Sequence, residues 1–158
     1  MFSSTVEYAF RAIVTLASRN GQSATAKDIA AVTKSPPNYV SKVMQTLVEG
    51  GLVNARRGPN GGFTLARPPE HITLLDVVNA VDPIERIRAC PIDLPEHAHQ
   101  LCPLHRVLDD TLAYVESQLG RYTIAALMDQ PPAAISPFQL TISARRVVAD
   151  AAPARRLD

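Results

Sequence analysis

The amino-acid sequence predicts a mainly α-helical fold, in which a winged helix-turn-helix is followed by a long C-terminal dimerisation helix. Three observations lead to this prediction. Before residue 50, apolar residues recur at three- and four-residue steps in three short segments, as in amphipathic helices. A glycine-rich turn between two short alternating runs then indicates a β-hairpin, and a longer amphipathic segment covers residues 104–119. Three helices followed by a hairpin is the element order of a winged helix.

Residues that start or stop helices bound each of the three N-terminal helices. Serine and threonine precede the first helix, Thr25 precedes the second, and a proline pair begins the third. An Asn-Gly pair follows the first helix and a Gly-Gly pair follows the third. The expected helices are residues 6–19, 26–33 and 37–49.

The hairpin that follows the third helix is called the wing below. Its strands are expected over residues 52–55 and 63–66, and the turn between them contains three glycines and Pro59. Apolar residues then return at helical spacing up to residue 81, with Thr73 placed to cap this short fourth helix.

The second half of the chain combines a loop, a long helix and a tail. Residues 90–103 contain three prolines and both cysteines, so we expect a loop. The narrow apolar stripe over 104–119 suits a helix that pairs with a second copy of itself, with docking on its own domain as the alternative. Thr123 is placed to cap a last short helix over 124–128, and the Ala/Pro/Arg-rich residues 131–158 are expected to be a largely disordered tail.

Charge is divided unevenly between the two halves of the chain. Residues 1–67 contain eight basic and three acidic residues, a net charge of +5, although the whole chain is only +1. A basic N-terminal half suits a polyanionic partner, with chance as the alternative. The N-terminus lacks a signal-peptide pattern and no apolar run is long enough for a membrane span, so we expect a cytoplasmic protein without a membrane partner.

The third helix and the wing provide the candidate DNA-binding residues. The outward face of the helix is expected to carry side chains that bond base edges or phosphates, and the wing places two arginines beside a slim turn that suits a minor groove. The candidates are Asn38, Tyr39, Ser41, Lys42 and Gln45 in the helix, and Arg56, Arg57, Gly58, Pro59 and Asn60 in the wing.

Several of these segments together resemble the Rrf2 family of bacterial transcription regulators, which includes iron–sulfur, nitric-oxide and cysteine-metabolism regulators. The resemblance covers residues 1 to about 130, and its most specific part is the wing followed by the fourth helix. It implies a homodimer, joined by the 104–119 helix, that binds a palindromic operator in double-stranded DNA. The matching segments are Glu7-Tyr8-Ala9, Ile29-Ala30, Asn38-Tyr39-Val40, Gly50-Gly51-Leu52-Val53, residues 57–63 and residues 72–82.

The same resemblance implies an iron–sulfur cluster in the loop before the long helix. Cys90 and Cys102 match the outer two of the three cysteines in this loop, and His105 matches a histidine that follows the last one in some members. Glu96 stands where the middle cysteine is expected, which departs from the family pattern. His105 is therefore the best third ligand and Glu7, from the partner subunit, the best fourth; a [2Fe–2S] cluster fits four such ligands best, with [4Fe–4S] as an alternative.

Other ligands and other chemistry compete with this interpretation. Asp93, Glu96, His97 and His99 are weaker candidate ligands from the loop. Without a cluster, the two cysteines would form a redox disulfide or bind zinc with His105 and a carboxylate, or the loop would bind a small molecule or nothing.

The predicted organisation is a winged helix-turn-helix DNA-binding domain over 1–83, a sensor loop over 84–103, and the dimerisation helix with the last short helix over 104–130. The leading functional hypothesis is a transcription regulator, a repressor, whose operator affinity is switched by a cluster that senses redox, nitric oxide or iron–sulfur status. The alternatives are a cluster-free regulator that senses thiol oxidation, zinc or a small ligand, and a winged helix used only for protein contacts. An enzyme is not expected, because the sequence shows no nucleophile–base arrangement and no phosphate loop.

Overall fold

The computed structural model describes residues 2–59, 61–90 and 100–129. The expected tail over 131–158 lies outside these residues. Within them, the mainly helical winged fold predicted from the sequence is confirmed, and no helix is both long and apolar enough to cross a membrane. The helices and strands, in chain order, are α1 Ser4–Ala17, α2 Ala26–Thr33, α3 Pro37–Glu49, β1 Val53–Arg56, β2 Gly62–Leu65, the short 3-10 helix η1 Pro69–His71, α4 Leu74–Val81, α5 Pro103–Arg121 and α6 Ile124–Met128.

The helix starts follow the local signals closely. Thr25 and Thr73 each form a capping box, in which the threonine hydroxyl accepts from the backbone N–H of an aspartate three residues on. The aspartate carboxylate in turn accepts from the threonine backbone N–H, and this bond lowers the pKa of Asp28. The first helix differs, because Ser3 occupies the N-cap position of α1 without a side-chain capping bond.

The wing is a two-stranded antiparallel sheet that is fastened to the helical domain. β1 and β2 pair with Val53 opposite Leu65 and Arg56 opposite Gly62. A short bridge before α2 holds the wing, since Ala24 and Phe63 exchange backbone N–H to C=O bonds of 3.0 and 2.8 Å. The wing strand β2 therefore has a fixed position relative to α1 and α2.

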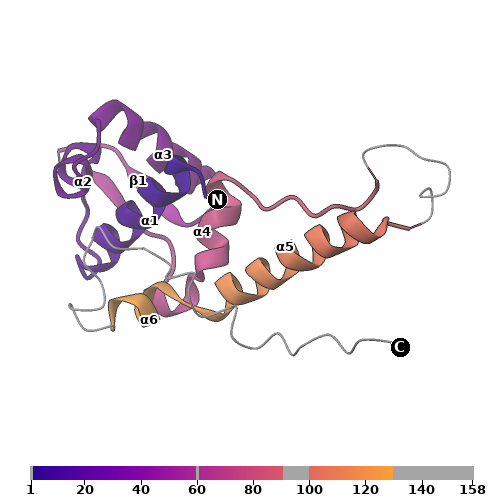
Figure 1. Cartoon of the computed structure of the whole chain (residues 1–158). Coiled ribbons are helices and arrows are strands. Elements are labelled where there is room, and N and C mark those ends of the chain that lie inside the picture. The colour runs from indigo at the N-terminus through magenta and orange to yellow at the C-terminus, as the bar shows by residue number, and fades with distance from the viewer. Residues whose placement is uncertain (1, 60, 91–99, 130–158) are drawn as a thin grey trace, which may run out of the picture.

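One hydrophobic core joins the two ends of the described chain. It is formed by buried residues of α1, α2, α3 and α4, and it includes Ile124 of α6, which has no exposed surface. α6 is also tied by backbone, because Ile124 N–H donates to Ile72 C=O at 2.8 Å and Leu74 N–H donates to Tyr122 C=O at 2.9 Å. Figure 1 shows the result: α5 extends away from the helical domain, while its C-terminal end returns to the domain through α6.

We predict that Gly62→Ala destabilises the protein more than Gly21→Ala. Both glycines have positive φ values, +141° and +84°. A methyl group at residue 62 would lie 2.8 Å from the backbone oxygen of Ala24, whereas one at residue 21 meets no atom within 4 Å. Urea unfolding is expected to show an additional loss of about 1–3 kcal/mol for Gly62→Ala, the usual effect of overpacking. Equal losses for the two variants would contradict this account of the wing contact.

Candidate metal centre and nucleic-acid interface

The third helix has one buried face and one exposed face. Its buried face packs into the core, and four of the five side chains expected to face outward are exposed. The buried residues are Val40, Val43, Met44 and Leu47, and the exposed candidates are Asn38, Ser41, Lys42 and Gln45. The exposed side chains form one surface that is free of apolar core residues and has the polar groups that bond bases and phosphates.

Tyr39 departs from the expected outward face. Its side chain is half-buried against the core, and its ring lies edge-on to the ring of Tyr8 with centroids 5.0 Å apart. The Tyr39 and Thr5 hydroxyl groups form a hydrogen bond of 2.7 Å. Position 39 directly precedes buried Val40 on the helix, so a large ring there reaches back over α1 instead of into solvent.

The wing turn exposes both of its arginines. Arg56 ends β1, and Arg57, Gly58 and Pro59 follow it on the surface. The turn is closed by a 2.9 Å bond from Gly61 N–H to Gly58 C=O, and Gly58 has a φ of +113°. Asn60 lies outside the described residues. The two guanidinium groups are thus carried on a narrow, glycine-containing turn.

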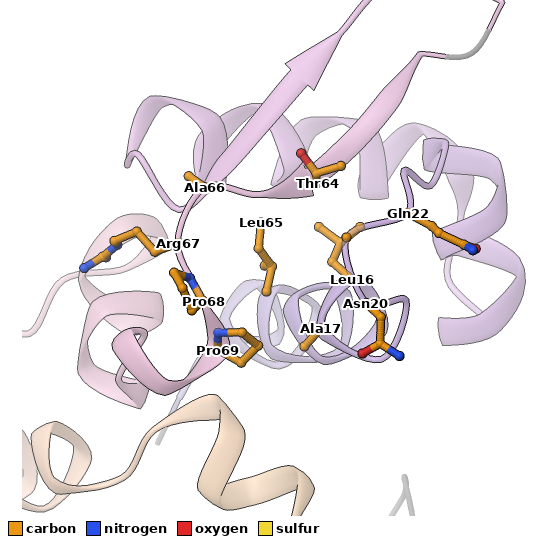
Figure 2. Close-up of a pocket in the computed structure, with 11 residues that line it drawn as sticks. Leu16, Ala17, Asn20, Gln22, Thr64, Leu65, Ala66, Arg67, Pro68 and Pro69 are labelled. Atoms are coloured by element: carbon orange, nitrogen blue, oxygen red, sulfur yellow. The ribbon is translucent and has the colours of Figure 1, made fainter.

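A shallow cavity of about 340 Å³ lies where the end of α1 meets the wing strand β2. Figure 2 shows Leu16 and Leu65 pointing into it, with Asn20 and Gln22 at one side. Arg67 is the charged residue of its lining, and this guanidinium is paired with Asp76 at 3.7 Å. The lining shares no residue with the cysteine-containing site, and it brings together no pair of titratable groups suited to acid–base catalysis.

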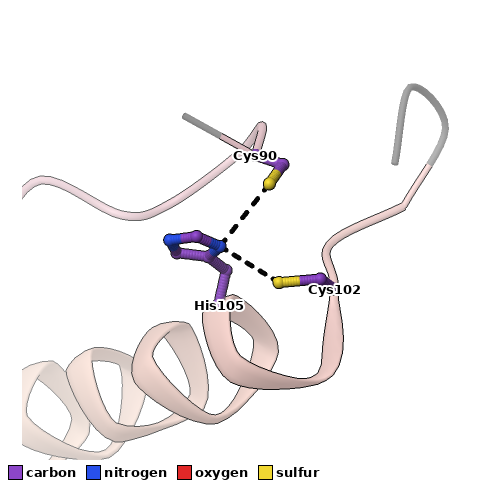
Figure 3. A group of neighbouring side chains, drawn as sticks. All are labelled: Cys90, Cys102 and His105. Atoms are coloured by element: carbon purple, nitrogen blue, oxygen red, sulfur yellow. Dashed lines mark hydrogen bonds between the residues drawn. The ribbon is translucent and has the colours of Figure 1, made fainter. Parts of the chain in front are cut away.

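Cys90, Cys102 and His105 come together as the sequence predicts. His105 Nδ1 lies 3.1 Å from Cys102 Sγ and 3.6 Å from Cys90 Sγ, and all three ligand atoms lie within 4.8 Å of one another. Figure 3 shows the imidazole with Nδ1 directed toward both sulfur atoms. Cys102 is the N-cap residue of α5 and His105 lies in its first turn, while Cys90 ends the segment that leads from α4. Cys90 is buried and the other two residues are half-buried.

Glu7, the ligand proposed from the partner subunit, is not part of this group in a single chain. Glu7 lies exposed on α1 and forms an ion pair of 3.5 Å with Arg11 one turn later. Asp93, Glu96, His97 and His99 lie outside the described residues. Among the residues that the structure describes, Cys90, Cys102 and His105 are the one group of three that could hold a metal ion.

The segment between α4 and Cys90, residues 82–90, is held along α5 by an ion-pair network that the sequence analysis missed. Arg86 donates from Nε and Nη2 to both carboxylate oxygens of Asp109, and from Nη1 to Glu116 at 3.2 Å. The backbone N–H of Ile87 also donates to Asp109, at 2.9 Å. These bonds from Arg86 lower the pKa of Asp109, and the same pair raises that of Arg86. No local pattern in the sequence indicates this network, because Arg86 and Asp109 lie 23 residues apart in the chain.

A profile of the Rrf2 family, described as "Iron-dependent Transcriptional regulator", matches residues 2–130. The protein belongs to the Rrf2 family. The resemblance in the sequence is thereby confirmed, and the chain is an Rrf2-family transcriptional regulator. A relative from Aquifex aeolicus, provisionally named an HTH-type transcriptional regulator, is 30% identical over 132 residues, which cover 82% of this chain and 92% of the relative. The family and this relative are regulators and not enzymes, in agreement with the sequence prediction.

Solved structures of Rrf2-type regulators share the fold of this chain. IscR from T. potens has a TM-score of 0.67 at 23% identity, covering 86% of this chain and 92% of that one. CymR from B. subtilis, described as the global cysteine regulator, has a TM-score of 0.65 at 22% identity, covering 80% of this chain and 95% of that one. At these identities the two matches establish the common fold only. The signal to which this Rrf2 regulator responds has to be inferred from its own residues.

Acid is expected to remove the stabilisation that Asp109 provides. Because its hydrogen bonds hold the pKa of Asp109 below the ordinary value, this stabilisation is complete above about pH 4 and is lost as the pH falls through the lower folded-state pKa. Urea unfolding between about pH 2 and pH 6 should therefore show a steeper loss of unfolding free energy toward acid for the native chain than for Asp109→Asn.

Asp110→Asn is the matched control, since Asp110 is the exposed neighbour of Asp109. This variant should keep the steep dependence of the native chain. Superimposable pH profiles for the native chain and Asp109→Asn would show that the ion pair does not stabilise the fold.

Proposed function

We propose that this regulator binds a palindromic operator as a homodimer and that an iron–sulfur cluster held by Cys90, Cys102 and His105 switches its operator affinity. The observation that carries the proposal is the convergence of these three ligand atoms within 4.8 Å, although the residues come from two segments. The exposed polar face of α3 and the arginines of the wing supply the DNA-binding surface.

The donor set fits an iron–sulfur cluster, most simply [2Fe–2S]. Two thiolates and an imidazole are ligands that iron takes in such clusters. A fourth ligand completes the set, and Glu7 of the partner subunit is the proposed source, with Asp93, Glu96, His97 and His99 as the loop alternatives. When bound, a cluster supplies a redox-active group that is sensitive to oxidation, nitric oxide and iron supply. A carboxylate ligand binds iron less strongly than thiolate, which suits a site that must respond to a signal.

The ligands lie where they can bias the DNA-binding surface. Ligation by Cys90 fastens residues 82–90 to the start of α5, where Cys102 and His105 lie. The 82–90 segment continues directly from α4, and α4 packs against α1, α3 and α5. Release of Cys90 therefore leaves this connection held only by the bonds of Arg86 and Ile87 to α5, which loosens the position of α5 relative to α4 and to α3, the proposed recognition helix. In a dimer joined through α5, a movement of α5 relative to α4 changes the distance between the recognition helices of the two subunits.

The proposed dimer uses the apolar side chains that α5 leaves exposed. No residue of α5 is buried in the single chain, and Leu104, Val107 and Tyr114 are each more than 60% exposed. A helix with this much exposed apolar surface suits pairing with a second copy, and two-fold symmetry then gives two recognition helices for the two halves of an operator.

A single zinc ion on the same three residues is the second candidate. In a tetrahedral zinc site, Zn–S bonds of about 2.3 Å and Zn–N bonds of about 2.05 Å separate neighbouring S and N atoms by about 3.6 Å. The spacings of 3.6 and 3.1 Å between His105 Nδ1 and the two sulfurs are close to this value. The proximity of the two sulfurs also favours reversible thiol oxidation as the cluster-free signal.

Protein purified without oxygen is expected to be red-brown and to contain iron and acid-labile sulfide in equal amounts. Cys90→Ala, Cys102→Ala and His105→Ala should each lower the iron content by at least about tenfold, and Cys102→Ala should abolish the signal response of DNA binding without unfolding the protein. His71→Ala is the matched control, since His71 is exposed and outside the ligand group. A colourless protein with zinc in place of iron would support the second candidate, and one that stays metal-free after reconstitution would reject both.

The double variant Arg56→Ala/Arg57→Ala is expected to weaken operator binding and to reduce its dependence on salt. Each lost phosphate contact lowers the slope of log affinity against log salt by about 0.9, so the slope should fall by up to about 2. Arg88→Ala/Arg121→Ala removes the same charge from exposed positions outside the wing and should leave the slope unchanged. An unaltered slope in the wing variant would rule out phosphate contacts by these arginines, and failure of the native protein to bind DNA would favour a protein-contact module.

A further inference from the structure

The bonds that hold residues 82–90 along α5 are concentrated at two adjacent residues. Asp109 Oδ1 accepts from Arg86 Nε at 2.7 Å and from Ile87 N–H at 2.9 Å, and Asp109 Oδ2 accepts from Arg86 Nη2 at 2.5 Å. One carboxylate therefore fixes both the side chain of Arg86 and the backbone of the next residue. A bidentate pair of this type restricts orientation as well as distance.

The position of this pair relates it to the candidate metal centre. Asp109 lies one helical turn after His105, and residue 87 lies three positions before Cys90. A turn of helix rises about 6 Å over four residues, and three residues of extended chain span at most about 10 Å. Once residue 87 is fixed at Asp109, Cys90 is thus confined to the neighbourhood of His105.

Residues 83–88 belong to no helix or strand that could hold them in place. Glu116 adds a second bond to Arg86, at 3.2 Å and seven residues beyond Asp109 on the same helix. In Figure 1 the segment follows α5 toward its N-terminal end, as these bonds require. The position of Cys90 therefore depends on the bonds between this segment and α5 and not on regular secondary structure.

We propose that Arg86 and Asp109 are positioning residues that assemble the Cys90–Cys102–His105 site before a metal binds. This inference rests on the proposed function for its biological meaning, because it treats these three residues as ligands. In physical terms, the ion pair raises the effective concentration of the Cys90 thiol near Cys102 and His105 in the metal-free protein. Loss of the ion pair releases the 82–90 segment, and a metal must then order it at the moment of binding.

The first experiment measures this effective concentration without metal. The metal-free protein is equilibrated with reduced and oxidised glutathione; one oxidised glutathione accepts two electrons from the Cys90 and Cys102 thiols, giving the protein disulfide and two reduced glutathiones. The equilibrium constant is compared for the native chain, Asp109→Asn and the control Asp110→Asn. We expect a decrease of roughly tenfold for Asp109→Asn and no change for Asp110→Asn.

The second experiment measures the affinity for Zn²⁺ alone, by competition with a chelator. The same variant should lose roughly tenfold in affinity, and Arg86→Lys, which keeps the charge but cannot pair in a bidentate manner, should lose less. If Asp109→Asn fails to fold, Arg86→Lys replaces it in both measurements. Its disulfide equilibrium constant and its zinc affinity are then expected to be lower than those of Asp110→Asn. Unchanged disulfide equilibrium and unchanged zinc affinity in folded variants would overturn the inference.

The two experiments separate this inference from the proposed function. If the native protein binds neither zinc nor iron, but Asp109→Asn lowers the equilibrium constant for disulfide formation, the positioning role is supported and the metal centre is rejected. If the native protein binds metal and the variants that lack the ion pair bind it equally well, the metal centre is supported and the positioning role is rejected.

Discussion

The packing of α6 into the core beneath α1 is the constraint on which the rest of the molecule depends. Ile124 has no exposed surface and shares one core with Ile13, Leu47 and Val77 of the winged domain. Backbone bonds between residues 122–124 and 72–74 add a directional contact to this apolar burial. Because α5 directly precedes α6, its C-terminal end cannot move freely, so the long helix extends from the domain in a defined direction.

The other end of α5 carries the candidate metal centre and is held by different forces. There the contacts are polar: the Arg86–Asp109 pair and the convergence of two thiols on His105. Nonpolar burial at one end is insensitive to redox state and metal supply, whereas the cysteine thiols at the other end belong to a chemical class that responds to both. The helix thus has an apolar attachment at α6 and a polar one near Cys90, and under the proposed function only the second would change with the signal.

The sequence predicted the elements of the fold well, because their signals are local. Thr25, Thr73 and Thr123 each cap the helix expected of them, and the bounds of the first four helices shift by at most a few residues. The joining of Cys90, Cys102 and His105 was also predictable, through the family resemblance. The inward position of Tyr39 and the Arg86–Asp109 pair depend on contacts between segments distant in the chain, for which a single sequence carries no periodic signal. The short helix η1, which begins at the second of two consecutive prolines, Pro69, was likewise missed.

The contribution of α6 to the core also bears on the order in which the chain is made. A polypeptide leaves the ribosome from its N-terminus, and domains fold as their residues emerge. The place of Ile124 in the core stays unfilled until the segments that carry Cys90, Cys102 and His105 have already been synthesised. A nascent or truncated chain that ends before α6 is therefore underpacked around α1, and the winged domain is fully packed only in chains that already contain Cys90, Cys102 and His105.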